Sequence, residues 1–560
     1  MNGLTLVAIA IVILTSAYIF YGRWLSKKWG IDPKAKTPAY THEDGEDYIP
    51  TPKFVVFAHQ FSSIAGAGPV TGPIIAAMFG WLPVLLWVLI GGIFFGAVQD
   101  FGALYASVKN EGKSIGIIIE KYIGKTGKKL FLLFAWLFTL LVIAAFSDIV
   151  ANTFNGFNKQ GMLNTPNAAA ASISMLYIVV AILFGLFIKR YQPSQKMEAV
   201  VGILLLFAML AGGIAYPLYF GKTTWTYVIF IYLFLASVMP MWLLMQPRDY
   251  LSSFLLIGMI AGAVLGVIVA NPTMNLPAFV GFNVNGKMLF PALFITIACG
   301  AVSGFHSLVS AGTSSKTVSN ERDMLMIGYG AMMLESLLAV IALVVVGAAA
   351  YDGKMPQGTP FEIFSSSVAG FLSLLGMPED IATCVMTMCV SALALTSLDS
   401  VARIGRMSFQ EFFMGESTDP MTMSPLQRIL TNKYFATVMT LFFGYLLCLG
   451  GYMNVWPLFG SANQLLCALV LIALSVFLKT TGRTGWTLYA PMCMMLVVTF
   501  TALAQSVFGI WQKVFYTGGF VWLIDGLQLV VAVALMSLGF MVAASCFRKL
   551  FDSKSKNIAA

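Results

Sequence analysis

Long apolar stretches follow one another along almost the whole chain, and only short polar segments separate them. A helix needs ~20 mostly apolar residues to cross the hydrocarbon core of a membrane, and windows of this kind run from Leu4 to about Cys546. By hydropathy there are about fifteen of them. The pattern predicts an all-α integral membrane protein with about fifteen transmembrane helices, and no soluble domain of any size fits between them.

The first window begins at Leu4. Two other apolar stretches are too short to span the membrane. SIGIIIEKYIG is expected to lie along the membrane surface, and FEIFSSSVAGFLSLLG is expected to form a helix over the outer face. The other expected spans cover, approximately, residues 54–79, 82–108, 130–154, 170–188, 198–219, 224–246, 251–271, 289–312, 326–350, 380–402, 434–452, 456–478, 485–506 and 518–545.

Lysine and arginine residues gather in alternate loops between the windows. The loop after the first window carries Lys27, Lys28, Lys34 and Lys36, whereas no basic side chain precedes that window. Cytoplasmic loops are the ones enriched in Lys and Arg. We therefore expect the N-terminus outside and the C-terminus in the cytoplasm. The other loops expected inside carry Lys109, Lys113, Lys121, Lys125, Lys128, Lys129, Lys189, Arg190, Lys196, Arg248, Lys316 and Arg322, and the tail carries Arg548, Lys549, Lys554 and Lys556.

Composition agrees with a membrane protein, because 59% of the residues are apolar and only 10% are charged. The net charge of +9 comes from these short loops and not from a basic domain, so it does not indicate nucleic-acid binding. The seven cysteines all lie in apolar segments without a CxxC motif, and we read them as small core residues.

Glycines and prolines interrupt the second window. In HQFSSIAGAGPVTGP, residues 59–73, the prolines Pro69 and Pro73 each remove a backbone donor, and three glycines lie beside them. A broken helix is tolerated in a membrane only where protein or a water-filled cavity surrounds the break. We expect the helix to open near Ala65 to Pro69; the alternative is an unbroken helix with a small-residue packing face.

A second interrupted window covers TIACGAVSGFHSLVSAGTS, residues 296–314, where Gly300, Ser303, Gly304 and His306 break the apolar run. By the loop charges, the two interrupted windows run in opposite directions. Paired interrupted helices of opposite direction are typical of secondary transporters with inverted repeats, whose substrate sits near the membrane midplane. Free half-helix ends there offer N–H groups to an anion and C=O groups to a cation.

Several ordered motifs resemble those of the carbon starvation protein (CstA) family. They are HQFSSIAGAGPVTGPIIAAMFGWLP, FFGAVQDFGALYASVKNEGKSIG, LLMQPRDYL, GAVSGFHSLVSAGTSSK, SLDSVARIGR and WPLFGSANQ. The resemblance covers about residues 53–478. It implies uptake of peptides or pyruvate across the bacterial inner membrane, driven by an ion gradient, in carbon starvation. It also implies a LeuT-like core, as in the amino acid/polyamine/organocation group, with two extra helices in the first half.

On this basis we divide the chain into a first helix and loop (1–52), a transporter core (53–478) and C-terminal helices with a short tail (479–560). Family members are often longer than this chain, and the region after about residue 480 offers little to compare.

Two histidines lie within the interrupted windows, and an ionisable side chain inside a membrane indicates function by default. His59 and His306 could bind a substrate carboxylate, relay a proton or ligate a metal, or each could be hydrogen-bonded to a neighbouring helix. Few further ligands are nearby, so we expect no metal site. The predicted substrate site consists of His59, Ser62, Ser63, Ala65, Gly66, Gly68, Gly300, Ser303 and His306.

TSLDSVARIGR, residues 396–406, places hydroxyls, an aspartate and two arginines at the inner end of a helix. In a LeuT-like core a sodium ion would be held here by hydroxyls and by carbonyls of the first broken helix, since hard cations prefer oxygen ligands. Asp399 could supply the charge or carry a proton instead. The alternative is an ordinary helix end with an i, i+4 pair to Arg403. The predicted ion-coupling residues are Thr396, Ser397, Asp399 and Ser400.

Other polar residues lie near expected helix ends. Gln246 and Pro247 are expected to end a helix, and Glu335 is expected to face protein and not lipid. Asn463 and Gln464 are expected to cross-link helices by hydrogen bonds. The predicted gating residues are Asp100, Asp148, Arg248, Asp249 and Arg403; for Asp100 and Asp148 the alternative is anchoring at the membrane interface.

Two other classes of function fit the sequence less well. A membrane-embedded enzyme would need a motif such as HExxH, which the sequence lacks, and a channel would more often assemble from repeated subunits. We therefore expect a secondary active transporter with no cofactor other than a coupling proton or sodium ion. Its partners would be a small substrate and the lipid bilayer, not nucleic acid, and the sequence does not indicate an oligomeric state.

Overall fold

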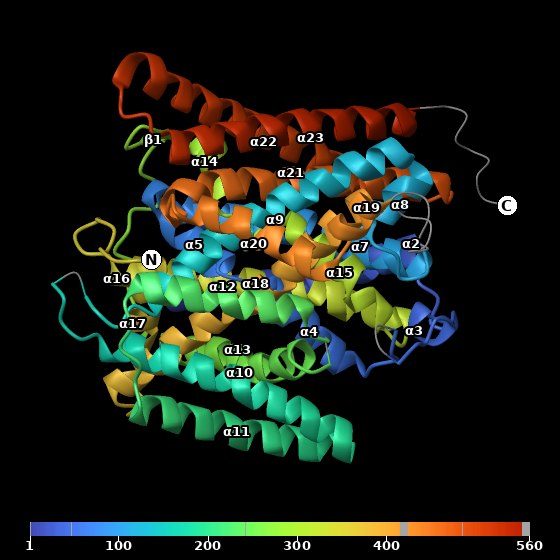
Figure 1. The fold of residues 1–560 in the computed structure, drawn as a ribbon. Coiled ribbons are helices and arrows are strands. Elements are labelled where there is room, and N and C mark those ends of the chain that lie inside the picture. Colours follow the sequence, from blue (N-terminus) through green and yellow to red (C-terminus); the bar gives the residue numbers. More distant parts are fainter. Residues whose placement is uncertain are drawn as a thin grey trace.

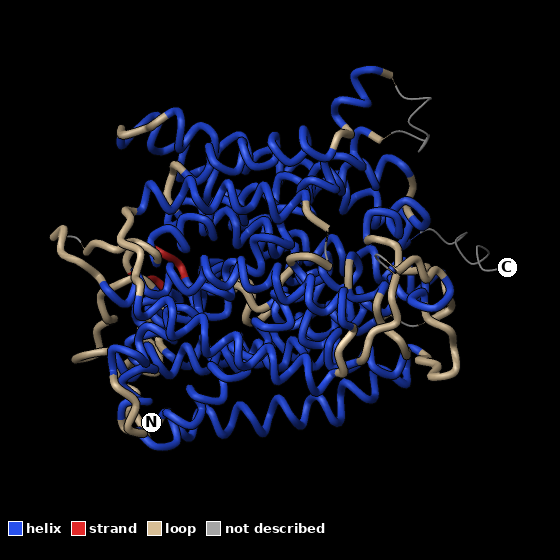
Figure 2. Tube along the Cα trace, turned by 60° about the horizontal axis from the view of Figure 1, so that its bottom comes forward, coloured by secondary structure: helices blue, strands red, loops and turns tan. Residues whose placement is uncertain are grey.

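A computed structural model describes residues 2–45, 48–158, 160–240, 242–414, 424–483 and 485–551. Its long helices run side by side between two ends of one bundle (Figure 1). Most of the described residues are helical, and the small hairpin of β1 (Asn283–Val284) and β2 (Lys287–Met288) is the sheet that they form (Figure 2). The predicted all-α class is confirmed.

Eleven helical segments of the described chain are long and apolar enough to cross a membrane, and the bent pair α4–α5 makes twelve. Two shorter apolar helices, α12 (Lys222–Val238) and α20 (Lys433–Cys448), lie among them. The expected number of about fifteen spans stays a prediction. The eleven segments are α1 (Gly3–Ser16) with η1 (Ala17–Gly22) and α2 (Arg23–Trp29); α6 (Trp81–Gly91) with η3 (Gly92–Gly96) and α7 (Ala97–Lys109); α9 (Lys125–Thr153); α10 (Thr165–Tyr191); α11 (Gln195–Ala215); α13 (Met245–Ala270); η5 (Glu321–Asp323) with η6 (Leu325–Gly330) and α16 (Ala331–Ala349); α18 (Glu379–Phe413); α21 (Tyr452–Thr480); α22 (Trp486–Gln512) with η7 (Lys513–Thr517); and η8 (Trp522–Gly526) with α23 (Leu527–Phe551).

Burial differs between helices in the way that a membrane bundle requires. In the most apolar stretch of α21 every residue is buried inside the protein, whereas α11 is mostly exposed and turns Leu204 and Phe207 outward. An apolar side chain facing lipid costs nothing, so exposure of this kind is expected at the rim of a bundle. The centre is therefore formed by α21, α18, α16 and α9.

Short helices and loops with many lysines form one end of the bundle, which we call the basic end. It contains α2, α3 (Pro38–Thr41) and α8 (Ile115–Tyr122), seen on the right in Figure 1. Lys109 pairs with Glu321 at 2.6 Å, and Tyr48 donates to the Glu111 carbonyl. Two more short elements are η4 (Ser314–Lys316) and α19 (Pro425–Leu430). The stretch SIGIIIEKYIG forms α8, and its expected position along the membrane surface stays a prediction.

The opposite end carries the first described residue and α17 (Pro360–Ser373), the helix expected in FEIFSSSVAGFLSLLG. Asn2 hydrogen-bonds to Asn271, in the loop after α13. Thr359 caps α17, with its hydroxyl accepting from the Glu362 N–H and the Glu362 carboxylate accepting from the Thr359 N–H. This capping box makes a stable helix of a segment that is too short to span.

Two helices are interrupted in the middle of the bundle, as predicted. The first consists of α4 (Lys53–Ile64) and α5 (Gly68–Ala76), bent by 43° across residues 65–67 and continued by η2 (Ala77–Phe79). The second consists of α14 (Leu289–Thr296) and α15 (Gly304–Gly312), with residues 297–303 between them. Since α4 packs on α15 and α5 packs on α14, the two helices are antiparallel.

Pro69 lies in the first turn of α5. A proline is tolerated there because the first N–H groups of a helix have no intrahelical partner in any case. The sequence motif therefore both ends α4 and begins α5, and the break is a defined structure between two helices.

One expected boundary is wrong. Gln246 and Pro247 do not end a helix, because α12 ends at Val238 and both residues lie in the first turn of α13. Pro247 is the third residue of α13, whereas Pro69 is the second residue of α5. As a result Arg248 and Asp249 lie within α13 and are buried, and not in a loop.

We predict that Gly68→Ala destabilises the protein. A Cβ atom at this position would lie 2.3 Å from the Cβ atom of Cys299, and overpacking of this kind costs about 1–3 kcal/mol. The melting temperature of the purified protein should fall, and Cys299→Gly in the same chain should restore part of it. Gly370→Ala is the control, because no atom lies within 4 Å of its added Cβ. Equal melting temperatures for Gly68→Ala and Gly370→Ala would contradict the packing described here.

Candidate transport site

The two breaks contact each other in the centre of the bundle. Gly68, at the start of α5, lies against Cys299, and Gly300 lies against Pro69. All four residues are buried. Of the predicted substrate residues, the structure therefore brings together the backbone of Gly68 and Gly300, and both are closed off from solvent in this conformation.

Helix α18 holds the end of α4 through two hydroxyl groups. Thr396 donates to the carbonyl of Ser62 at 3.0 Å, and Ser397 donates to the carbonyl of Ser63 at 3.2 Å. These carbonyls belong to the last turn of α4, where they have no intrahelical partner. Gly66 makes the approach possible, since a Cβ atom there would lie 2.6 Å from the Ser397 hydroxyl. The predicted ion-coupling hydroxyls thus face the predicted substrate segment.

Asp399, one turn further along α18, forms a buried ion pair with Arg248 of α13. Tyr232 of α12 lies at the same place and hydrogen-bonds to both the Asp399 carboxylate and the Arg248 guanidinium. Arg248 has only 2% of its side chain exposed and Asp399 none. The ion pair therefore joins α12, α13 and α18 inside the apolar bundle. Arg403, the expected i, i+4 partner, donates to the carbonyls of Ala236 and Met239.

A second buried ion pair continues this network to α4. Asp249 contacts the Arg248 guanidinium at 3.3 Å and the Nδ1 atom of His59 at 2.9 Å. The other ring nitrogen of His59 lies 3.1 Å from the Thr313 hydroxyl of α15. His59 is thus held between two helices, with 16% of its side chain exposed. The network runs from α18 through α13 to the halves of both broken helices nearest the basic end.

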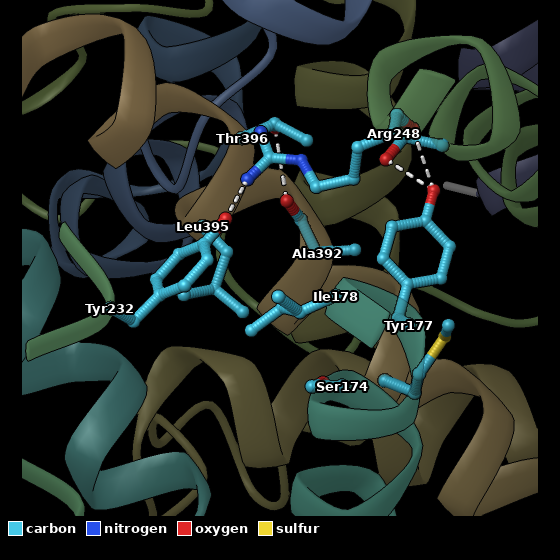
Figure 3. Close-up of a pocket in the computed structure, with 10 residues that line it drawn as sticks. Ser174, Tyr177, Ile178, Tyr232, Arg248, Ala392, Leu395 and Thr396 are labelled. Atoms are coloured by element: carbon cyan, nitrogen blue, oxygen red, sulfur yellow. Dashed lines mark hydrogen bonds between the residues drawn. The ribbon is translucent and has the colours of Figure 1, made fainter. Parts of the chain in front are cut away.

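A cavity of about 290 Å³ lies beside Arg248 (Figure 3). Tyr177 of α10 points into it and donates to the Arg248 carbonyl at 2.8 Å, and its oxygen lies 2.7 Å from the Ser252 hydroxyl. Thr396 and Tyr232 line the same cavity. Because Thr396 also bonds to Ser62, the cavity adjoins the contact between α18 and α4.

His306, in the first turn of α15, lies between two carboxylates. Its Nδ1 atom is 2.9 Å from Asp100 of α7, and its Nε2 atom is 3.3 Å from Glu335 of α16. None of the three side chains is exposed. Glu335 faces protein, as predicted, and Asp100 lies beside a break and not at a helix end.

Asn463 of α21 hydrogen-bonds to residues at the second break. It exchanges hydrogen bonds with the Ser303 hydroxyl and accepts one from the Phe305 N–H at 3.0 Å. Gln464 donates to the carbonyl of Phe294 in α14. The predicted cross-linking role of these two amides is confirmed.

Asp148 lies in the second half of α9, towards the end opposite the basic end. It pairs with Lys222 of α12 at 2.7 Å and accepts from the Tyr452 N–H at 2.9 Å. A cavity of about 210 Å³ next to it is lined by Thr71 of α5 and Phe361 of α17. Thr71 places this cavity beside α5.

A larger pocket of about 730 Å³ opens between α8, α9, α15 and α18, near the basic end. Its wall is mostly apolar, with Ser400, Arg403 and Glu411 of α18 as polar members. Thr313, the partner of His59, also lines it. The pocket therefore reaches the network that holds α4 without reaching the breaks themselves.

Comparison with known proteins identifies the family of this chain. The family model described as carbon starvation protein CstA matches residues 2–355 and 349–502. The chain belongs to the carbon starvation protein CstA family. Its relatives include the peptide transporter CstA of Escherichia coli K12, which is 32% identical over 99% of this chain and 84% of its own length.

Two further relatives of the family are the pyruvate/proton symporter BtsT of Escherichia coli K12 and the peptide transporter CstA of Bacillus subtilis 168. BtsT is 31% identical over 90% of this chain and 82% of its own length. The Bacillus protein is 30% identical over 98% of this chain and 97% of its own length. The resemblance expected from the sequence motifs is confirmed.

Among solved structures, the chain is similar to a manganese transporter of Eremococcus coleocola, with a TM-score of 0.48, 11% identity and coverage of 90% of this chain and 99% of that one. It is also similar to MhsT in complex with L-phenylalanine, with a TM-score of 0.45, 14% identity and coverage of 90% and 100%.

Sequence reasoning missed several residues of the site. Tyr177 and Tyr232 lie in apolar stretches that give no sign of a polar partner, and Thr313 is one of several small polar residues that follow the second break. Gln60, next to His59, hydrogen-bonds to Ser310 of α15 and Ser314 of η4, at 2.8 and 2.6 Å. A polar side chain inside a predicted span was the available signal for Gln60, since such groups need partners.

We predict that Asp399→Asn destabilises the protein because it removes one of the two carboxylates that contact the buried Arg248 charge. Removal of one partner of a buried ion pair costs about 3–5 kcal/mol. Thermal unfolding in detergent should show a large loss, and Arg248→Met added to Asp399→Asn should recover much of it. Asp380→Asn, at the exposed start of α18, is the control. An unchanged melting temperature for Asp399→Asn would refute the pairing.

Proposed function

We propose that the protein is a secondary active transporter that imports a small carboxylate-bearing nutrient, a peptide or pyruvate, across the bacterial inner membrane. The observation that carries the proposal is the contact between two antiparallel broken helices inside the bundle. A break of this kind offers backbone groups at the membrane midplane, which is where secondary transporters bind substrate. Relatives over most of the chain are named as a peptide transporter and a pyruvate/proton symporter, which supports these two substrates.

The substrate carboxylate is proposed to bind at the breaks. The first N–H groups of α5 and α15 start there, and helix N-termini favour anions. Ser62, Ser63 and Ser303 would add polar contacts, and the small residues Ala65, Gly66, Gly68 and Gly300 leave room for substrate when the helices separate. His59 and His306 border the site, where each already has protein partners.

Alternating access requires movement of the half-helices nearest the basic end. His59, Asp249 and Thr313 hold α4 against α13 and α15, and the pocket of about 730 Å³ lies directly beside Thr313. Separation of this contact would open a route from the breaks to that pocket. The Asp148–Lys222 pair covers the other route. Asp148, Arg248, Asp249 and Arg403 are thus proposed as gate residues, with Asp100 coupled to them through α7.

The coupling ion is proposed to act where α18 meets α4. The hydroxyls of Thr396, Ser397 and Ser400, with the carbonyls of Ser62 and Ser63, are ligands suited to a hard cation. Asp399 already has Arg248 as a partner. A sodium ion at this carboxylate would have to displace the guanidinium, whereas a proton would release it.

The basic end is proposed to face the cytoplasm, with the N-terminus outside. Support comes from the lysines of α8 and of the loops beside it, since positively charged loops stay on the cytoplasmic side. The last turn of α23 carries Arg548 and Lys549, and Lys479 donates to the Leu550 carbonyl beside them. We propose accordingly that the C-terminus lies in the cytoplasm.

Uptake into proteoliposomes tests the proposal. Labelled peptide and labelled pyruvate are supplied separately to vesicles with an imposed pH gradient or an imposed sodium gradient. We expect accumulation of at least one substrate above the level of protein-free vesicles under at least one gradient. If neither substrate accumulates under either gradient, the proposed function is wrong.

The ion site has its own prediction. Thr396→Val keeps the shape of the side chain but removes the hydroxyl that contacts Ser62. A sodium ion held here would lose a ligand, so the sodium concentration for half-maximal uptake should rise. Thr387→Val, one of the hydroxyl residues earlier on α18, is the control. Sodium dependence equal to that of the original protein would remove Thr396 from the ion site.

A further inference from the structure

The three side chains of His306, Asp100 and Glu335 form a closed polar cluster, and their charges do not balance. Within the described part of the chain, His306 is the only ion-pair partner of either carboxylate. A doubly protonated imidazole carries one positive charge, and two carboxylates carry two negative charges. With every group in its common charged form, the cluster therefore keeps one uncompensated negative charge.

Burial makes that charge costly. All three side chains have no exposed surface, and a charge taken out of water without a partner is disfavoured by several kcal/mol. One more proton, on either carboxyl group, makes the cluster neutral. The closed conformation is therefore favoured when two protons are bound, one on the imidazole and one on a carboxylate.

Several carboxylate oxygens of the cluster accept no hydrogen bond from the described part of the chain, so they are available to carry the second proton. Both carboxylate oxygens of Glu335 and the Oδ1 atom of Asp100 lack a hydrogen-bond partner among the described residues. A buried carboxylate normally finds several donors. Oxygens without donors are better suited to a neutral carboxylic acid than to an anion, which is the state that charge balance also requires.

Among the residues that the structure describes, no neighbouring group supplies a fixed positive charge to the cluster. The other titratable groups beside the cluster are the buried thiols Cys299, in the second break, and Cys467, on α21. Asp399 differs in this respect, because it has Arg248 as a permanent cation. Arg248 also contacts Asp249, whose second partner is His59, so that network has one permanent cation for two carboxylates, whereas the cluster of Asp100 and Glu335 has none in the described chain.

The cluster is also joined to the contact between the breaks. His306 lies two residues after Gly304, where α15 begins, and Gln99 donates to the Ser303 carbonyl at 2.8 Å. Cys299 lies against Gly68 of the first break. A tilt of α15 that separates the breaks would thus move His306 away from Asp100 and Glu335 and would change the number of protons that the cluster holds.

We propose that His306, Asp100 and Glu335 form the proton-binding site whose loading and release couples a proton to the movement of α15. Loading adds one proton to a carboxylate and gives the neutral, closed cluster; release returns that proton to water when the cluster opens. The inference rests on the proposed transport function and, where the coupling ion is a proton, assigns that proton to this cluster and not to the contact between α18 and α4.

Proteoliposomes with a trapped pH-sensitive dye test this proposal. The probe is whichever substrate, peptide or pyruvate, the original protein accumulates in the uptake experiment. An inward substrate gradient should acidify the vesicle interior, because each substrate brings a proton with it. Glu335→Gln mimics a permanently protonated carboxyl, so it should still catalyse exchange of labelled for unlabelled substrate, which needs no net proton movement. It should lose substrate-driven acidification.

Asp525→Asn is the matched control, because this buried carboxylate has a lysine partner, Lys513, in the C-terminal helices. It should keep both exchange and acidification. Glu335→Asp, which retains the carboxyl group, should recover part of the acidification that Glu335→Gln loses.

Each other outcome is decisive. If Glu335→Gln still acidifies the vesicles at the original rate, or if it loses exchange, the carboxyl group has another role and the proposal is overturned. Substrate movement without acidification by the original protein also overturns it, while the proposed transport function stands. If the original protein moves no substrate, it is the transport function itself that fails.

Discussion

The hydrocarbon core of a membrane contains no groups that can hydrogen-bond to exposed backbone N–H and C=O groups. Two helices of this protein are nevertheless interrupted in the middle of the bundle. The structure meets this constraint by placing each break against other protein segments. Thr396 and Ser397 of α18 bond to the last carbonyls of α4, and Asn463 of α21 bonds to the first turn of α15. Helices α18 and α21 are among the most buried of the molecule because they carry out this task.

Charged groups in the bundle follow from the same shortage of water. Arg248 and Asp399 neutralise each other, and Tyr232 bonds to both. His59 and Asp249 extend the network to α4. A buried ion pair adds little net stability, but loss of one partner is costly. The network therefore acts as a set of discrete contacts that are either made or broken, which suits a protein with two access states.

Much of the fold could be predicted, since it follows from local properties of the chain. Spans are visible as apolar windows, and the breaks are visible because Gly66, Gly68 and Pro69 cannot continue a helix. The boundary at Gln246 and Pro247 was wrong because a proline is compatible with both the end and the first turn of a helix. Residues 415–423, between the predicted spans that end at 402 and begin at 434, lie outside the described residues.

Prediction of the candidate site was less complete. Residue type alone singled out His59, His306, Asp399 and Arg248, because ionisable groups in a membrane are rare. Their partners were not predictable. The partner expected for Asp399 was Arg403, on the same helix, but Asp399 pairs with Arg248 of α13. Tyr232 and Tyr177 gave no signal, since tyrosine is common in apolar helices.

The sequence by itself determined the membrane environment, the two interruptions and the residues that must be neutralised, because hydropathy, helix propensity and charge are properties of each segment alone. Only the tertiary structure decided which carboxylate forms an ion pair with the arginine and which two carboxylates contact the same histidine. Asp399 lies opposite Arg248, and Asp100 and Glu335 lie on either side of His306. The physical reason is that a charge in the bundle interior is compensated only by atoms within a few ångströms, and helices far apart in the sequence supply those atoms.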